Sequence, residues 1–435
     1  MKTLEFLIYT IILFMPTYLI RFSIFGVPTN VLEVLVGIAL ASWLLMRIMN
    51  IVQPFALFII RNSLFIIGIS LVFLGIVLGI FVSPDARTSL GVLKGWFLVP
   101  LAFFIVARSV LDTREKKEKA LWSLALSGIG VAAIGFFYWV KGSVTFDGRF
   151  SAFYESPNML AMYIAPAFLI TTLALCQKLK GRRQKFLLFC FVLLLLVLLL
   201  TRSVGALVGI GGALAFYFST LRWGKVWGKL GIRIFIVIIV IGLLLPFSSL
   251  FFDPWEMGRT SIASRFMIWR VSIEMLKDHW LFGIGPGVFQ EYYLAYQKNF
   301  PPFLEWAVPH PHNIFLTTWL YGGVVGLLGF FIILYGSFKK SHSTHYSLFT
   351  IYLIYLFIHG TIDNTLWRND AAMIFSLMMI LGSLAFWQYF SRGYLANKAA
   401  LACSLGGFSL ARIPKGPIIT LLIVGKTGIS AWTGF

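Results

Sequence analysis

The chain has 435 residues, of which 59% are hydrophobic and 12% are charged, and its mean hydropathy is +0.88. Because a soluble domain carries roughly 25% charged residues, this composition excludes a chain whose whole surface faces water. The formal net charge of +20 suggests nucleic-acid binding, but the basic residues form short clusters between apolar runs and no basic stripe alternates with aromatic residues. We therefore expect a membrane protein without a nucleic-acid partner.

Apolar runs follow one another along most of the chain, and a membrane-spanning helix needs about 20 such residues. Twelve candidate spans cover approximately residues 4–25, 31–49, 62–82, 89–107, 121–140, 157–176, 186–201, 203–220, 231–251, 312–336, 346–363 and 370–390. The seventh and eighth are either a hairpin or one broken element. The first run is long and lacks an A-x-A-like cleavage site, so we interpret it as a retained helix. The pattern predicts an all-α polytopic membrane protein.

The distribution of basic residues predicts the orientation of these spans. With the N-terminus inside, the dense clusters at 108–119, 178–185 and 222–229 all fall in inner loops, as the positive-inside rule requires. This assignment gives an N-terminal bundle of about nine helices over 1–251, a large extracytoplasmic (periplasmic) loop subdomain over 252–311, C-terminal spans over 312–390 and a cytoplasmic tail over 391–435. We expect the tail to be disordered or peripheral.

The outer segments contain four groups of polar residues that are candidates for chemistry. Arg149 and Asn158 flank the start of the sixth span, where a helix N-terminus favours an anion, although ordinary capping explains them as well. Arg202 lies at the junction of two spans and is either a ligand or an interfacial arginine whose charge reaches water. Small residues after it favour close helix packing, namely Gly205, Ala206, Gly209, Gly211 and Gly212.

The third group belongs to the large outer loop. Apolar residues at helical spacing in "SRFMIWRVSIEMLKDHW" predict an amphipathic helix that carries Arg265 and Arg270 and lies on the membrane or on the transmembrane core. Three glycines follow, at Gly283, Gly285 and Gly287. They indicate a plain turn, or a loop whose backbone N–H groups meet a phosphate.

The fourth group is "HPHN", which contains His310, His312 and Asn313 at the point where the large loop re-enters the membrane. A neutral imidazole accepts a proton near physiological pH. A metal site is the less favoured alternative, because Glu305 is the one nearby third ligand that the sequence suggests. The three cysteines, Cys176, Cys190 and Cys403, have no CxxC partner and imply neither a disulfide framework nor a thiolate metal site.

The order of several segments resembles the O-antigen ligase and polymerase family of bacterial membrane glycosyltransferases. The resemblance covers roughly residues 85–390 and is carried by "GRFSAFYESPN", "LTRSVGA", "SRFMIWRVSIEMLKDHWLFGIGPGVF", "HPHNIFLTTWLYGGVVGLLGF" and "HGTIDNTLWRNDAAMIFSLMMIL". It implies a multi-pass protein of the bacterial cytoplasmic (inner) membrane, surrounded by membrane lipids. It also implies inverting glycan transfer from a polyprenyl diphosphate to a glycan, lipid or protein acceptor on the outer face, without a cofactor or metal.

The resemblance also implies roles for individual residues. His312 matches the histidine that activates the acceptor or stabilises the leaving group, and Arg265 matches the arginine that holds the diphosphate. Arg149, Asn158 and Asp363 match further polar positions of the family, and Arg270, His310 and Asn313 are grouped with them as substrate-binding candidates. One departure is that Val204 stands where many members have arginine, so Arg202 substitutes from two residues earlier or that contact is absent.

Three functions remain open at this stage. A glycosyltransferase explains why Arg149, Arg265 and His312 are predicted on one face. A multi-pass transporter or flippase of lipid-linked glycans predicts ionisable residues inside the spans and internal repeats, but Glu33 and His359 are the main such residues and no repeat is evident. A membrane scaffold without activity gives no reason for the shared face.

Overall fold

The computed structural model of the protein describes residues 2–49, 63–145, 148–176, 181–223, 245, 261–301, 303, 305, 308–342, 348–382, 420–425 and 428–433. The chain divides into two units, Met1–Trp387 and Gln388–Phe435.

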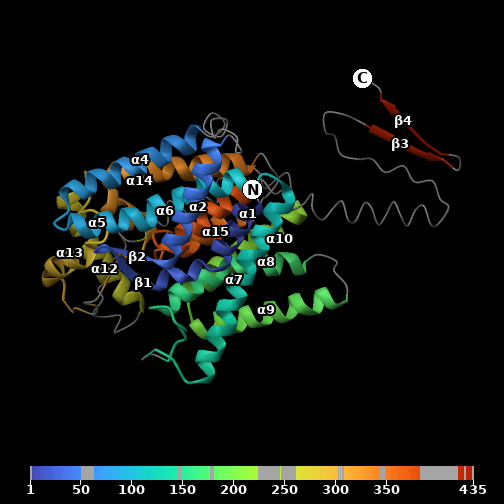
Figure 1. The fold of residues 1–435 in the computed structure, drawn as a ribbon. Helices are drawn as coiled ribbons and strands as arrows, with labels where there is room; N and C mark the ends of the chain where they lie inside the picture. The colour runs from blue at the N-terminus through green and yellow to red at the C-terminus, as the bar shows by residue number, and fades with distance from the viewer. Residues whose placement is uncertain are drawn as a thin grey trace. The chain divides into compact units, whose positions relative to one another are not determined.

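The first unit is built almost entirely from helices (Figure 1). They are α1 (Lys2–Leu13), α2 (Val31–Ile48), α4 (Ser63–Val82), α5 (Ala86–Leu93), α6 (Val99–Val110), α7 (Arg114–Val140), α8 (Pro157–Leu175), α9 (Arg182–Thr201), α10 (Val204–Trp223), α12 (Ser261–His279), α13 (Phe289–Tyr296), α14 (Ile314–His342), α15 (Leu348–Gly360) and α16 (Asn369–Leu381). Short segments complete the unit: the 3-10 turns η1 (Met15–Leu19) and η4 (Gln297–Asn299), the π-helical turn η2 (Lys94–Leu98), and strands β1 (Arg21–Ile24) and β2 (Val27–Asn30).

Seven helical segments of the described residues are long and apolar enough to cross a membrane, and three shorter apolar helices accompany them. The seven are α2, α4, α5 with η2 and α6, α7, α8, α9 and the first part of α14; the shorter three are α10, α15 and α16. These helices confirm a polytopic, mainly helical membrane protein. The number of twelve spans and the large outer loop stay predictions, and the predicted span 231–251 lies outside the described residues.

The predicted first span, 4–25, is wrong in its extent. Helix α1 ends at Leu13, and Pro16, which has no N–H to continue a helix, lies in the 3-10 turn that follows. The chain then forms an antiparallel hairpin of β1 and β2. Phe25 and Gly26 both have positive φ angles at its tip, as a two-residue hairpin turn of type I′ requires. Hydropathy does not distinguish such a hairpin from a continuing helix.

The predicted pair 186–201 and 203–220 forms two helices, α9 and α10. Helix α9 ends at Thr201, and Arg202 is its C-cap, with a φ of 49° in the left-handed region. On α10, Gly205 and Gly209 lie directly against His359 and Tyr355 of α15. The prediction of close packing is therefore confirmed for these glycines, whereas Gly211 faces open space.

Helices α4 and α14 lie side by side along much of their length (Figure 1). A Cβ atom at Gly75 would collide with the carbonyl oxygen of Gly322 and with the backbone of Gly326. The two backbones therefore approach closely through small residues, as is common between helices in membranes. This packing holds the start of α14, where the "HPHN" segment lies, against the rest of the bundle.

In the second unit the structure describes an antiparallel hairpin of β3 (Thr420–Gly425) and β4 (Gly428–Thr433). These strands differ from the all-α prediction and from the disorder expected after about residue 395. The apolar stretch "TLLIVG" is too short to span a membrane but has the β-branched content of a strand.

Candidate active site

His312 and Asp363 form the centre of a polar cluster between the loop before α14 and the loop after α15. The Nδ1 atom of His312 lies 3.0 Å from Oδ1 of Asp363. The Asp363 side chain is 3% exposed and that of His312 is 27% exposed. The carboxylate favours the tautomer with its proton on Nδ1, which leaves a lone pair on Nε2. Within the described residues, Nε2 of His312 has no hydrogen-bond partner, so the pair presents a basic nitrogen at the surface of the cluster.

The other oxygen of Asp363 faces an amide and a guanidinium. Asn158 Nδ2 donates a hydrogen bond of 2.9 Å to Oδ2, and Arg265 Nη2 lies 3.8 Å from the same oxygen. Burial raises the pKa of the Asp363 carboxyl, but the neighbouring His312 and the charge of Arg265 lower it more, so the pKa lies well below its usual value. The site therefore contains a buried, ionised carboxylate.

Arg265 projects from α12 toward the loop that follows α15. Its Nε donates to the Ile362 carbonyl at 2.8 Å, and its Nη1 donates to the carbonyl and the hydroxyl of Ser261 one turn earlier. The guanidinium therefore fixes the backbone next to Asp363. Its Nη2 is the part that faces the Asp363 carboxylate.

Arg149 is connected to the Asp363 carboxylate through Asn158. Its Nη2 donates to Oδ1 of Asn158 at 2.8 Å, and its Nε donates to the Thr201 carbonyl at 2.9 Å. The sequence predicts that Arg149 and Asn158 flank the start of α8, and the structure shows in addition that their side chains bind each other. Their side chains point to Asp363 and to the end of α9, while Ser156 caps α8 by accepting from the Met159 N–H.

His310 completes the cluster from the same loop as His312. The two imidazole rings have their centroids 4.4 Å apart and meet edge to face, and His310 Nδ1 accepts a hydrogen bond from the His312 backbone N–H. Burial and, secondarily, the neighbouring His312 lower the pKa of His310 to about 3. Ligand atoms of His310, His312 and Asp363 all lie within 4.8 Å of one another. The third potential metal ligand is thus Asp363 and not Glu305, which accepts instead from Ser264 of α12.

Three of the predicted site residues are placed differently. Asn313 caps α14: its Oδ1 accepts from the N–H groups of Phe315 and Leu316, and its Nδ2 donates to the Thr361 carbonyl. Arg202 is exposed at the junction of α9 and α10. Arg270 follows Arg265 by five residues on α12, which rotates its Cβ by roughly 140° to another face of the helix.

A second buried ion pair lies close by and was missed by sequence reasoning. Arg368 donates from Nε and Nη2 to the two oxygens of Asp370, at 2.5 and 2.9 Å, and its Nη2 also lies 3.3 Å from the Met159 carbonyl of α8. The guanidinium stands over the ring of Tyr154, 5.8 Å from its centroid. The pair joins the start of α16 to the first turn of α8, which carries Asn158. The sequence signal for this ion pair was the arginine and the aspartate in "WRND", which lie two residues apart.

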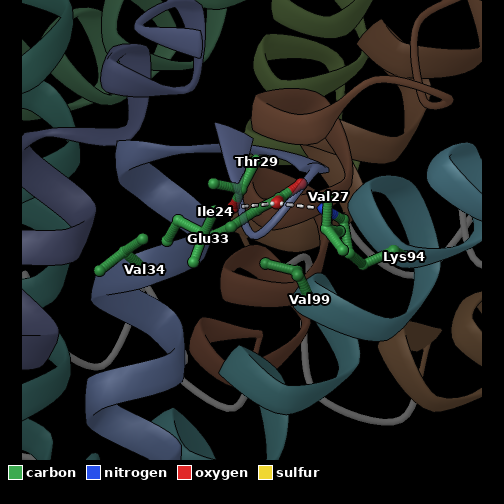
Figure 2. Close-up of a pocket in the computed structure, with 7 residues that line it drawn as sticks. All are labelled: Ile24, Val27, Thr29, Glu33, Val34, Lys94 and Val99. Carbon is green, nitrogen blue, oxygen red and sulfur yellow. Dashed lines mark hydrogen bonds and ion pairs between the residues drawn. The ribbon is translucent and has the colours of Figure 1, made fainter. Parts of the chain in front are cut away.

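A separate shallow pocket of about 410 Å³ opens beside the hairpin of β1 and β2 (Figure 2). Its apolar wall is Ile24, Val27, Val34 and Val99, and its polar wall is Thr29, Glu33 and Lys94. The Glu33 carboxylate accepts from Thr29 and pairs with Lys94 at 2.8 Å. Because these charges satisfy each other and none of the predicted site residues lines the pocket, we place the candidate active site at the His312 cluster.

The three glycines after α12 lie in a turn with left-handed backbone angles. All three have positive φ angles, of 74°, 85° and 85°. The Gly283 N–H donates to His279 and the Ile284 N–H to Leu320 of α14. The Ile284 N–H joins the turn to α14, and neither of these two N–H groups is available to a phosphate, so the plain-turn interpretation holds at Gly283 and Ile284.

Part of the chain is similar to a known protein family. Residues 189–331 match the family described as O-antigen ligase, and no curated protein matches the chain. The predicted resemblance is thereby confirmed over residues 189–331. The matched segment includes Arg265, His310 and His312, whereas Arg149, Asn158 and Asp363 lie outside it. The match supports an enzyme of the O-antigen ligase or polymerase type that acts on glycans in a membrane.

Proposed function

From the O-antigen ligase domain at residues 189–331, we propose that the chain transfers a glycan from a polyprenyl diphosphate to a hydroxyl of an acceptor on the outer face of the bacterial cytoplasmic membrane. The observation that carries this proposal is the His312–Asp363 pair, with a buried carboxylate on Nδ1 and an open Nε2. An imidazole oriented in this way is suited to remove a proton from an attacking hydroxyl.

In this proposal the acceptor is a sugar, lipid or protein hydroxyl. Nε2 of His312 takes the hydroxyl proton while the oxygen attacks the anomeric carbon from the side opposite the diphosphate, so the configuration inverts. Asp363 keeps the Nδ1 proton in place and stabilises the imidazolium that forms. A base positioned in this way contributes roughly 10²–10⁴-fold to the rate.

The leaving group requires positive charge because a diphosphate gains charge as the anomeric C–O bond breaks. Arg265 is the candidate, since within the described residues its Nη2 donates no hydrogen bond and an arginine keeps its charge at any physiological pH. Fixed donors of this kind stabilise the transition state more than the ground state. Charge supplied by arginine explains why this chemistry does not require a metal.

The test is transfer by purified protein in liposomes that contain a lipid-linked glycan and an acceptor. We expect His312→Ala to lower the rate by roughly 10²–10⁴-fold and Arg265→Ala by roughly 10²–10³-fold. His279→Ala, at the far end of α12, is the matched control for removal of an imidazole. Wild-type turnover in both site variants would end the proposal.

A strain that lacks the protein separates the finer alternatives. A ligase leaves complete polymer on the carrier lipid, and a polymerase leaves single repeat units there. A transporter or flippase instead leaves the lipid-linked glycan on the inner face, and the liposome assay then shows movement of the carrier without a new glycosidic bond.

A further inference from the structure

The His312 cluster gathers more ligand atoms than the proposed transfer uses. We propose that His310, His312 and Asp363 bind a transition-metal ion, of which Zn²⁺ is the best fit, and that the bound ion blocks transfer. Two imidazoles and one carboxylate are a donor set that zinc prefers. His310, which has no role in the proposed proton transfer, supplies the third ligand.

The distances suit this ion. Zinc binds nitrogen and carboxylate oxygen at about 2.0–2.2 Å, so two ligands of a tetrahedral site stand about 3.4 Å apart. The His312 and Asp363 ligand atoms are 3.0 Å apart, and the whole set of three lies within 4.8 Å. Binding requires the His310 ligand atom to move toward the other two, and the fourth position of a tetrahedral site is left for water.

The two carboxylate oxygens of Asp363 have different partners. Oδ1 faces His312, accepts from the Asn364 backbone N–H and is the metal-binding oxygen, while Oδ2 keeps Asn158 and the nearby Arg265. An ion on Oδ1 therefore replaces the His312 hydrogen bond but leaves the contacts of Oδ2 in place. The charge of Arg265 opposes the ion, so we expect weaker binding than in a structural zinc site, as suits a reversible inhibitor.

Inhibition follows from the tautomer of His312 and rests on the proposed function. A metal on Nδ1 takes the lone pair that the Nδ1 proton occupied, and in the neutral ring this proton moves to Nε2. No proton is released overall, but Nε2 becomes a donor and no longer accepts a proton from the attacking hydroxyl. The ion thus inhibits transfer by inactivating the base.

The first measurement is binding and requires no substrate. Full-length protein in detergent, purified without a histidine tag and stripped of metal, competes with a chromophoric chelator for Zn²⁺. We expect one bound ion per wild-type chain. His310→Ala and His310→Gln weaken it at least about tenfold, because even changes behind a metal ligand cost 10–100-fold. His279→Ala, an imidazole that contacts Tyr296 at the end of α12, leaves binding unchanged.

A wild-type chain that takes up no Zn²⁺ overturns the inference, as does a folded His310→Gln chain that binds with wild-type affinity. Thermal unfolding checks that the variants are folded. The second measurement adds Zn²⁺ to the liposome assay: the wild-type rate falls and EDTA restores it. Binding without inhibition overturns the blocking role. Absence of transfer under every condition counts against the proposed function and leaves the binding result intact.

Discussion

At the scale of single residues, some side chains of the cluster are candidates to contact the substrate, whereas others hold the Asp363 carboxylate in place. Arg149 was predicted to bind the substrate, but two of its donors bind the Thr201 carbonyl and Asn158. Asn158 in turn donates to the carboxylate that orients His312. We infer that Arg149 is a positioning residue: it fixes the Asn158 amide, and through it Asp363.

This role distinguishes Arg149→Lys from an ordinary loss of charge. A lysine keeps the charge but cannot reach both acceptors with a planar fork. Because a hydrogen bond to a charged group contributes about 1.5–3 kcal/mol, we expect kcat to fall by roughly 10–100-fold while KM for the lipid carrier stays within about twofold. The liposome assay with varied carrier concentration measures both.

Arg87→Lys is the matched control, because Arg87 is exposed and donates to the Gly26 carbonyl of the β1–β2 hairpin. It is expected to leave kcat and KM unchanged. A raised KM with an unaltered kcat in Arg149→Lys would instead mean that Arg149 contacts the diphosphate directly.

At the scale of elements, the break in the helical geometry of α14 at Gly323 connects α12 and the turn after it to the bundle. Gly323 has φ 61° and ψ −167°, a conformation that is essentially restricted to glycine. The turn after α12 enters this break: the Val324 N–H donates to the Leu281 carbonyl, and the Ile284 N–H donates to the Leu320 carbonyl. Helix α14 carries the "HPHN" loop at its start, so the break links α12 with Arg265 to the loop with His312.

Gly323→Ala should therefore destabilise the protein. A Cβ atom there would collide with the Leu281 carbonyl oxygen, and the backbone conformation itself costs about 1–3 kcal/mol for a residue with a side chain. We expect a lower thermal midpoint in detergent and reduced transfer. Gly326→Ala, one turn along the same helix with its nearest atom at 3.8 Å, is the control and should be neutral or slightly stabilising. Equal midpoints for the two variants would contradict this account of the break.

Helices of this fold could be predicted from sequence wherever hydropathy alone determines them, as α2 and α8 illustrate within one or two residues. The error at α1 arose because Pro16 and the Phe25–Gly26 turn are local signals that an apolar run conceals. The site was harder to predict. The resemblance pointed to His312 and Asp363 separately. No local sequence pattern predicts that Asn158 and Arg149 lie next to the Asp363 carboxylate, which is some 200 residues later in the chain.

At the scale of the whole molecule, loops that the charge pattern assigns to the outer face contact one another. Arg21, in the β1–β2 hairpin, pairs with Glu155 before α8 at 3.2 Å, and Arg87 in the first turn of α5 reaches the same hairpin at Gly26. Asn158, Arg265 and Asp363 bring three more such segments together. The positive-inside rule and these contacts are independent, and both group the same loops on one side.

This agreement predicts the result of labelling single cysteines in a chain whose Cys176, Cys190 and Cys403 are replaced by serine. Phe25→Cys, at the exposed tip of the β1–β2 hairpin, should react with a membrane-impermeant maleimide in intact spheroplasts. Glu115→Cys, in the exposed and basic first turn of α7, should react only after permeabilisation, because positive loops stay on the cytoplasmic side. The reverse pattern would place the hairpin, and with it the His312 cluster, in the cytoplasm. Transfer on the outer face would then be impossible for this site, whatever its geometry.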